Sequence, residues 1–253
     1  MIIKKTPEQI EKMHRAGRVL AEVIEDLKDA VKPGARLSDI DALAERSIRL
    51  RGAVPSFLGY RGFPASICAS VNEEIVHGIP GPRVLEEGDI LSADFGLILD
   101  EWHADSAYTY PVGEIDERSA HLLETTKRAL DAAIEQCYPG KRIGDIGSAV
   151  EAVVNEAGFS VVREYAGHGI GRSLHEDPQV LNYGSPGRGP LLEPGWVLAI
   201  EPMVNAGAWQ TRILDDGWTV VTADGSVSAH FEHTVAITEE GPLVLTAPAR
   251  VPA

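Results

Sequence analysis

The sequence predicts one α+β domain with an internal repeat, in which two helix–helix–strand units share a sheet. Residues 33–40 (PGARLSDI) return 106 positions later as residues 139–146 (PGKRIGDI), and residues 51–53 (RGA) match residues 157–159 (AGF) at the same offset. Each copy lies between two segments with helical spacing of apolar residues, and strand-like runs follow each pair. A chance recurrence of a turn motif is the alternative, but several matches at one offset and in the same context favour a true repeat, so we expect pseudo-twofold symmetry.

The four helices are predicted from caps and apolar spacing. The first is expected over residues 7–31, because a threonine suits its N-cap and a proline suits its first turn. The second is expected to start at Ser38 as its cap and to run to Leu50, with Gly52 ending it. The helices of the second copy are expected at residues 117–137 and 145–157.

Strands are expected after each helix pair. The predicted segments are 64–76 and 89–113 in the first copy, and 160–165 and parts of 196–237 in the second. Neither set is large enough to cover its helices, so we expect both to join into one mixed antiparallel sheet. No Ser/Gly-rich linker separates the copies, and residues 1–253 are therefore expected to form a single catalytic domain without an N-terminal extension.

The composition limits the class of partner. The chain is 44% hydrophobic and 24% charged, as is usual for a globular enzyme, and its net charge of −15 disfavours nucleic acid or anionic membranes as partners. Two cysteines argue against a disulfide framework. No apolar run has the length of a signal-peptide core or of a membrane span of about 20 residues. We expect a cytoplasmic protein.

Acidic residues stand inside the predicted strands. Asp94, Glu201 and Glu232 each interrupt an apolar run, and a lone carboxylate there would cost several kcal/mol to desolvate. A cation shared among them would remove this cost. Asp105 joins the set if the hairpin loop after residue 99 has an even number of residues, because Asp94 and Asp105 then share a face. An odd number would separate them, and exposed hairpin charges are the alternative.

His168 lies among three glycines, which leave room for a ligand to approach the backbone. Imidazole is a common metal ligand, although a histidine satisfied within the core is the alternative. Four carboxylates and one histidine are richer in oxygen than a single catalytic zinc site and suit two divalent ions such as Mn, Fe, Co or Zn. Calcium fits less well, because histidine is a poor ligand for it and the acids are scattered along the chain.

These residues lie in motifs that resemble the type I methionine aminopeptidases, which have the pita-bread fold. The resemblance covers nearly the whole chain, and its most specific motifs are residues 70–80 (SVNEEIVHGIP), 167–171 (GHGIG), 200–203 (IEPM) and 232–234 (EHT). It implies five metal ligands, namely Asp94, Asp105, His168, Glu201 and Glu232. It further implies that Asp105 and Glu232 bridge two ions, that Asp94 holds one, and that His168 and Glu201 hold the other.

The resemblance also implies a reaction. The enzyme would remove the N-terminal methionine from new proteins and peptides, preferably before a small second residue. A hydroxide bridging the two metals would attack the scissile carbonyl, because metals can lower the pKa of water to about 7. Glu201 would carry the proton from water to the leaving amine. His175 would contact the scissile amide and stabilise the oxyanion, and His77 would line the substrate channel and assist proton transfer or positioning.

The resemblance assigns the methionine pocket to Tyr60, Phe63, Cys68 and Trp218, although each could simply be a core residue. Aromatic rings suit contacts with the thioether, and no Cys/His pairing indicates a cysteine nucleophile. Two positions depart from the family pattern. Gly96 stands where a hydroxyl residue is common, which removes a hydrogen bond near the metals and puts the relative metal affinity in doubt. Leu174 stands where an aromatic is common, which predicts a looser pocket.

Two other functions stay open at this point. One is an X-Pro aminopeptidase of the same fold, although such relatives usually carry a large N-terminal domain. The other is a non-catalytic binding protein of this fold, although such proteins lose metal positions. The expected partner is the N-terminus of a peptide or nascent chain that begins with methionine. A transient ribosome contact would need a basis other than residues 205–216, which are poor in positive charge. The resemblance implies a monomer.

Overall fold

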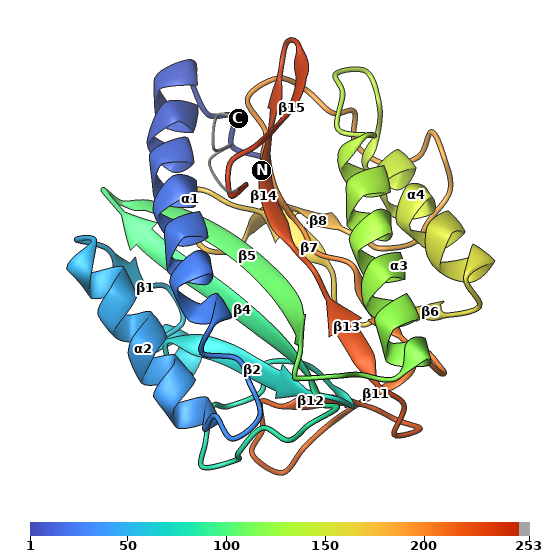
Figure 1. The fold of residues 1–253 in the computed structure, drawn as a ribbon. Helices are drawn as coiled ribbons and strands as arrows, with labels where there is room; N and C mark the ends of the chain where they lie inside the picture. The colour runs from blue at the N-terminus through green and yellow to red at the C-terminus, as the bar shows by residue number, and fades with distance from the viewer. Residues whose placement is uncertain (248–253) are drawn as a thin grey trace, which may run out of the picture.

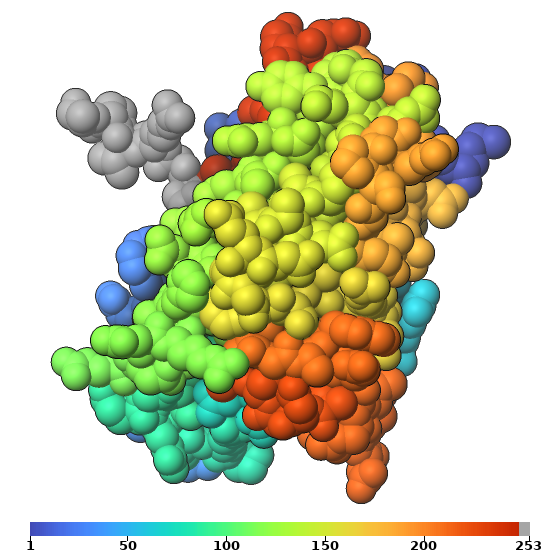
Figure 2. Space-filling view, turned by 90° about the vertical axis from the view of Figure 1, so that its right-hand side faces the viewer, coloured from blue at the N-terminus to red at the C-terminus, as the bar shows by residue number. Residues whose placement is uncertain are grey.

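The structure, a computed structural model, describes residues 1–247 and places two pairs of helices on a central layer of strands (Figure 1). Helices α1 (Pro7–Lys28) and α2 (Leu37–Leu50) pack on the strands of the first copy, and α3 (Glu117–Ile134) and α4 (Ile143–Glu156) pack on those of the second. From the side of the second pair, the helices and the loops of the C-terminal half form one continuous surface (Figure 2). The predicted α+β class is confirmed.

The strands are short except for the central hairpin of β4 and β5. They are β1 (Val54–Pro55), β2 (Ile67–Val71), β3 (Glu74–Val76), β4 (Ile90–Leu99), β5 (Trp102–Pro111), β6 (Ser160–Val161), β7 (Gly167–Gly169), β8 (Glu176–Val180), β9 (Val197–Ile200), β10 (Met203–Asn205), β11 (Thr211–Ile213), β12 (Val220–Thr222), β13 (Ser228–His230), β14 (His233–Thr238) and β15 (Gly241–Val244). A short 3-10 helix, Tyr60–Gly62, lies between β1 and β2.

The repeat found in the sequence is also a repeat of the backbone. Gly34 and Gly140 have φ angles of 87° and 89°, and Gly52 and Gly158 have φ angles of 74° and 77°. These left-handed conformations favour glycine, which explains why the glycines of the motif recur. Arg36 forms an isolated bridge with Val84, and Arg142, its counterpart, forms one with Leu191.

The second helix of each copy begins earlier than the sequence predicts. The expected cap at Ser38 is wrong, because α2 begins at Leu37 and its N-cap residue makes no side-chain cap. The N–H groups of Leu37 and Ser38 instead donate to the carbonyls of Arg83 and Gly81 in a neighbouring loop, which satisfies the first turn without a side chain. The other expected bounds also differ: α1 ends at Lys28, α3 ends at Ile134, and α4 runs from Ile143 to Glu156.

Within residues 1–247, the strands form four hydrogen-bonded sets rather than one continuous ladder, and every pairing is antiparallel. Their orders are β1-β4-β2 with β5 on β4, β13-β10-β6, β11-β12-β3 and β15-β14-β9-β7-β8. The two copies meet where β5 runs beside residues 230–234. There the hydroxyl of Thr109 donates to the carbonyl of His230, and the hydroxyl of Thr234 donates to that of Asp105. Side chains thus replace part of the ladder along this seam, where carboxylates of both copies come together.

The core is divided in the same way as the helices. One large apolar cluster lies under α1 and α2, another lies under α3 and α4, and a smaller cluster between them includes Phe57, Phe63 and Leu174. Within residues 1–247, no helix is both long and apolar enough to cross a membrane.

Candidate metal centre

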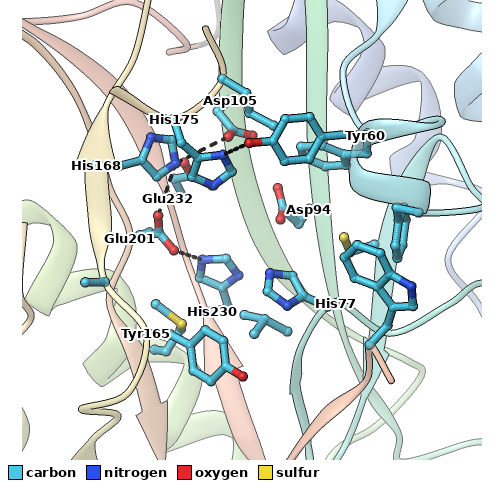
Figure 3. A pocket seen from close by; sticks show the side chains of 18 of the residues that line it. Tyr60, His77, Asp94, Asp105, Tyr165, His168, His175, Glu201, His230 and Glu232 are labelled. Atoms are coloured by element: carbon cyan, nitrogen blue, oxygen red, sulfur yellow. Dashed lines mark hydrogen bonds and ion pairs between the residues drawn. The ribbon is translucent and has the colours of Figure 1, made fainter. Parts of the chain in front are cut away.

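All five predicted ligands surround one cavity of about 400 Å³ between the two copies (Figure 3). The first copy contributes Asp94 from β4 and Asp105 from β5. The second contributes His168 from β7, Glu201 directly after β9, and Glu232 between β13 and β14. The pseudo-twofold arrangement therefore brings together side chains that are far apart in the sequence.

The β4–β5 hairpin sets the positions of the two aspartates. Its loop has two residues, Asp100 and Glu101, whose φ angles of 48° and 71° are those of a type I′ turn. The loop length is even, so Asp94 and Asp105 share a face, with Asp105 opposite Gly96 in the neighbouring strand. The two aspartates are diagonal neighbours, within reach of one another across the ladder.

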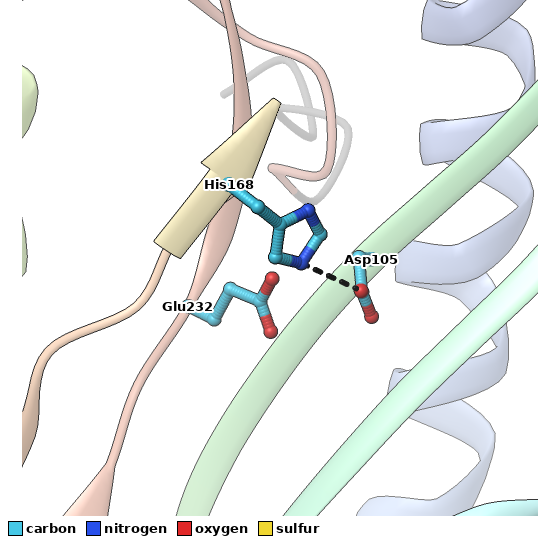
Figure 4. Close-up of side chains that lie close together, drawn as sticks. All are labelled: Asp105, His168 and Glu232. Atoms are coloured by element: carbon cyan, nitrogen blue, oxygen red, sulfur yellow. Dashed lines mark ion pairs between the residues drawn. The ribbon is translucent and has the colours of Figure 1, made fainter. Parts of the chain in front are cut away.

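The imidazole of His168 points at the carboxylates. Its Nδ1 lies 2.8 Å from the carbonyl of Gly169, which can only accept, so Nδ1 carries the proton and Nε2 presents a lone pair. Nε2 is 3.9 Å from Asp105 Oδ2 and 3.6 Å from Glu201 Oε1. One ligand atom each from Asp105, His168 and Glu232 lies within 4.8 Å of the other two (Figure 4). A lone pair facing carboxylate oxygens at these separations fits a cation between them.

The electrostatics of the site lead to the same conclusion. Burial raises the pKa of Asp94 to about 7, and burial together with repulsion from neighbouring carboxylates raises the pKa of Asp105 and Glu232 well above the usual range. Burial lowers the pKa of His168 to about 3, so this imidazole is neutral. Within the described residues, Asp94 Oδ1, Asp105 Oδ1 and Glu232 Oε1 are buried without a hydrogen-bond partner. Buried acceptors are normally satisfied, and divalent cations would satisfy this group.

Two further histidines line the cavity. Nδ1 of His175 lies 2.9 Å from the hydroxyl of Tyr60, and its ring centre is 4.2 Å from that of His168. The rings of His77 and Tyr165 form a T-shaped pair with their centres 5.7 Å apart, and His77 has a left-handed backbone with a φ of 60°. Both side chains point into the cavity beside the carboxylates (Figure 3).

The predicted pocket residues line one apolar part of the same cavity. Phe63 and Trp218 meet edge-to-face at 5.1 Å, and Tyr60 lies beside them. Cys68 pairs with Asp94 across the β2–β4 ladder and therefore faces the cavity. Burial and the neighbouring carboxylates raise the pKa of its thiol well above the usual range, so it is not a reactive nucleophile.

Comparison with known proteins gives the family. Residues 11–239 match the model of metallopeptidase family M24. The chain belongs to this family. It is 54% identical over 246 residues to methionine aminopeptidase 1 of Bacillus subtilis, and this match covers 97% of the chain and 99% of the relative. It is 44% identical to the methionine aminopeptidase of Escherichia coli, over 96% of the chain and 92% of the relative.

Solved structures agree with this assignment. The methionine aminopeptidase of Thermotoga maritima superposes with a TM-score of 0.96 at 46% identity, over 97% of the chain and 99% of that structure. The prolidase of Pyrococcus furiosus superposes with a TM-score of 0.80 at 24% identity and shows only a shared fold. The resemblance to the methionine aminopeptidases and the pita-bread fold are thereby confirmed.

Sequence reasoning missed several residues of this M24 site. His230 is 2% exposed and places Nε2 3.8 Å from Glu201 Oε2, and its spacing of two residues from Glu232 could have indicated a shared face. Phe57 also lines the cavity and accounts for one departure from the family pattern. A Cβ atom on Gly96 would lie 2.6 Å from the ring of Phe57, so a side chain there would force that ring to move. An aromatic ring thus occupies the place of the expected hydroxyl residue.

Proposed function

We propose that the chain is a metal-dependent methionine aminopeptidase, which removes the N-terminal methionine from new proteins and peptides when the second residue is small. The observation that carries this proposal is one cavity in which two buried carboxylates, two partly buried carboxylates and a neutral imidazole adjoin an apolar pocket. The high identity to methionine aminopeptidases along nearly the whole chain supports methionine as the residue removed.

Two divalent ions, of Co, Mn, Fe or Zn, are the proposed cofactors. We assign Asp105 and Glu232 as the ligands shared by both ions, Asp94 as a ligand of one, and His168 and Glu201 as ligands of the other. Asp94, Asp105 and Glu232 each keep a buried oxygen without a hydrogen-bond partner, which is available to a cation. When bound, such a pair supplies a nucleophile from water near neutral pH and polarises the scissile carbonyl.

Glu201 is the proposed proton carrier between water and the leaving amine. Burial and the charge of Asp94 raise the pKa of Glu201 well above its usual range, which favours uptake of a proton. Its Oε1 faces His168, and its Oε2 faces His230. The carboxylate therefore lies between two imidazoles and points into the cavity.

His175 is the proposed donor to the scissile carbonyl oxygen. Burial, with the nearby charge of Arg61, lowers the pKa of His175, so the ring is neutral. When the hydroxyl of Tyr60 donates to Nδ1, the proton of the neutral ring must be on Nε2, which can donate to a developing oxyanion. Burial likewise lowers the pKa of His77 to about 4, and we propose that neutral His77 positions the scissile amide.

Tyr60, Phe63, Cys68 and Trp218 are the proposed walls of the methionine pocket, to which we add Phe57. Their aromatic rings suit an unbranched thioether, because sulfur makes favourable contacts with ring edges. We further propose that residues 1–253 act as one catalytic domain. A cytoplasmic location, a monomeric state and a transient ribosome contact stay predictions, which cell fractionation, gel filtration and co-sedimentation with ribosomes would check.

A panel of peptides tests the proposed function. The metal-loaded protein is expected to release methionine from Met-Ala-Ser and to leave Leu-Ala-Ser and Ala-Pro-Ser intact, as followed by chromatography. Cleavage confined to the bond before proline would favour the X-Pro alternative. Absence of cleavage of every peptide, with metal bound, would favour a binding protein.

A further inference from the structure

The mouth of the cavity carries two charged side chains outside the proposed ligand set. Arg61 comes from the 3-10 helix Tyr60–Gly62 of the first copy, and Glu164 comes from the loop before β7 in the second. Both are exposed, and both line the cavity. Two divalent ions would balance the charge of the four ligand carboxylates. Apart from those four, Arg61 and Glu164 are the only aspartate, glutamate, lysine or arginine residues within residues 1–247 that line the cavity.

Arg61 is held in an unfavourable backbone conformation. Its φ of 50° and ψ of 22° are left-handed, and it lies between Gly59 and Gly62, whose φ angles are 82° and 91°. A residue other than glycine costs about 1–3 kcal/mol in such a conformation. The turn is closed by the N–H of Gly59, which donates to the carbonyl of Phe63 at 2.8 Å. The backbone of this turn thus places a long cationic side chain at the mouth, where glycine would fit without strain, and this points to a functional role.

The guanidinium of Arg61 lies beside the proposed catalytic group. It sits over the ring of Tyr60, 5.4 Å from the ring centre, and the hydroxyl of that ring bonds His175. Two other exposed arginines, Arg163 and Arg172, form ion pairs with acids at 3.2 Å and 3.0 Å. Within residues 1–247, no carboxylate forms an ion pair with Arg61, so its donors are available to a substrate.

The path of the substrate leads past this group. If the proposed function holds, the methionine side chain fills the pocket and the scissile amide lies near His175, so the rest of the peptide leaves through the mouth. An extended chain advances about 3.3 Å per residue, which brings the third residue within reach of an arginine side chain at the rim. We propose that Arg61 is a specificity-determining residue that binds a carboxylate carried by the substrate after its second residue.

The chemistry of guanidinium supports a carboxylate as the group bound. Its planar set of N–H donors can bind both oxygens of a carboxylate. The guanidinium of Arg61 makes no ion pair within residues 1–247, so these donors can bind a carboxylate of the substrate. The carboxylate can belong to an acidic side chain at the third position or to the C-terminus of a tripeptide. The net charge of −15 repels acidic peptides as a whole, so a preference for them would have to arise from a local cation.

Two matched pairs of peptides separate the sources of the carboxylate. Met-Ala-Glu-Ser amide is compared with Met-Ala-Gln-Ser amide, and Met-Ala-Gln as the free acid is compared with its amide. At low ionic strength, the member with the carboxylate is expected to have a kcat/KM about two- to fivefold higher in at least one pair. The difference is expected in KM, because the contact is remote from the reacting bond, and it should shrink as salt is added.

Variants at position 61 identify the residue responsible. Arg61→Asn, which tolerates a left-handed backbone, is expected to remove the preference, Arg61→Lys to retain part of it, and Arg61→Glu to invert it. Arg49→Asn on α2 is the control, because it changes the net charge equally outside the cavity and should keep the preference. Equal kcat/KM values within both pairs, or a preference that survives Arg61→Asn, would overturn this inference alone. Absence of methionine release from all four peptides would overturn the proposed function as well.

Discussion

A buried ion pair at the start of the chain gives the sharpest test of the structural reasoning. Lys5 Nζ lies 2.7 Å from Glu176 Oε2, and the two side chains are only 2% and 6% exposed. Glu176 directly follows His175, and its other oxygen accepts the N–H of Ser173 at 3.3 Å. Gly171 borders the pair so closely that a Cβ atom there would lie 2.5 Å from the carboxylate of Glu176. The pair thus fixes the turn that carries a proposed catalytic histidine.

Lys5→Met should destabilise the protein strongly, because it leaves the carboxylate of Glu176 buried with one weak donor. Removal of one partner of a buried pair costs about 3–5 kcal/mol. For a chain of this size, 1 kcal/mol corresponds to about 2–4 °C, so the melting temperature should fall by about 6–20 °C. Thermal and urea unfolding, followed by circular dichroism on the metal-loaded protein, measure both quantities.

The preceding residue provides a matched control. Lys4 pairs with Glu193 at the surface, where the side chains are 57% and 41% exposed, and exposed pairs contribute about 0–1 kcal/mol. Lys4→Met should therefore change stability little. Adding Glu176→Gln to Lys5→Met should recover part of the loss, because no unpaired buried charge is left. A Lys5→Met variant as stable as Lys4→Met would refute this reasoning.

Three other predictions follow from particular contacts. Gly96→Ser should cost about 1–3 kcal/mol in urea unfolding, because a Cβ atom collides with Phe57, and Phe57→Ala should relieve that cost; an additive loss in the double variant would contradict the packing. Tyr60→Phe should lower kcat for Met-Ala-Ser more than it raises KM, because His175 loses the hydroxyl that orients it, and unchanged kcat would count against this role. Metal addition should raise the melting temperature by an amount that grows as pH rises from about 4 to above 7. Without metal, burial raises the pKa of Asp94 from 3.8 to about 7, so between these pH values the unfolded chain releases a proton that the folded protein retains, and the folded state loses stability as pH rises. A bound cation offsets this loss, and a gain independent of pH would contradict the reasoning.

The sequence was sufficient for features that depend on local pattern. The repeat was visible because its glycines adopt left-handed conformations that few other residues tolerate, as at Gly34 and Gly140. Asp94 and Asp105 could be placed together because side chains alternate along strands, and only the parity of the loop was unknown. The acids within apolar runs indicated a cation before any contact was known.

Features that depend on contacts across the fold were not accessible in the same way. From the sequence, Gly96 is interpreted as the loss of a hydroxyl side chain. In the folded chain the ring of Phe57 packs against Gly96, and this contact explains why glycine stands there. The start of α2 was misplaced because its N–H groups find carbonyls in the loop at residues 81–83 instead of a capping side chain. The strands form separate sets because threonine hydroxyls join the two copies at the central seam, and nothing in the strand pattern specifies this.

The central claim is that Asp94, Asp105, His168, Glu201 and Glu232 together hold the metal ions on which peptide cleavage depends. In the most direct test, metal-free protein is titrated with Mn, Fe, Co or Zn. Bound metal is measured by mass spectrometry after dialysis, and activity is measured as the release of methionine from Met-Ala-Ser. Cleavage should be absent without metal and should rise with occupancy, and Asp105→Asn should lower both bound metal and cleavage. Cleavage by the metal-free protein at the rate of the loaded protein, or full metal binding by Asp105→Asn, would contradict the claim.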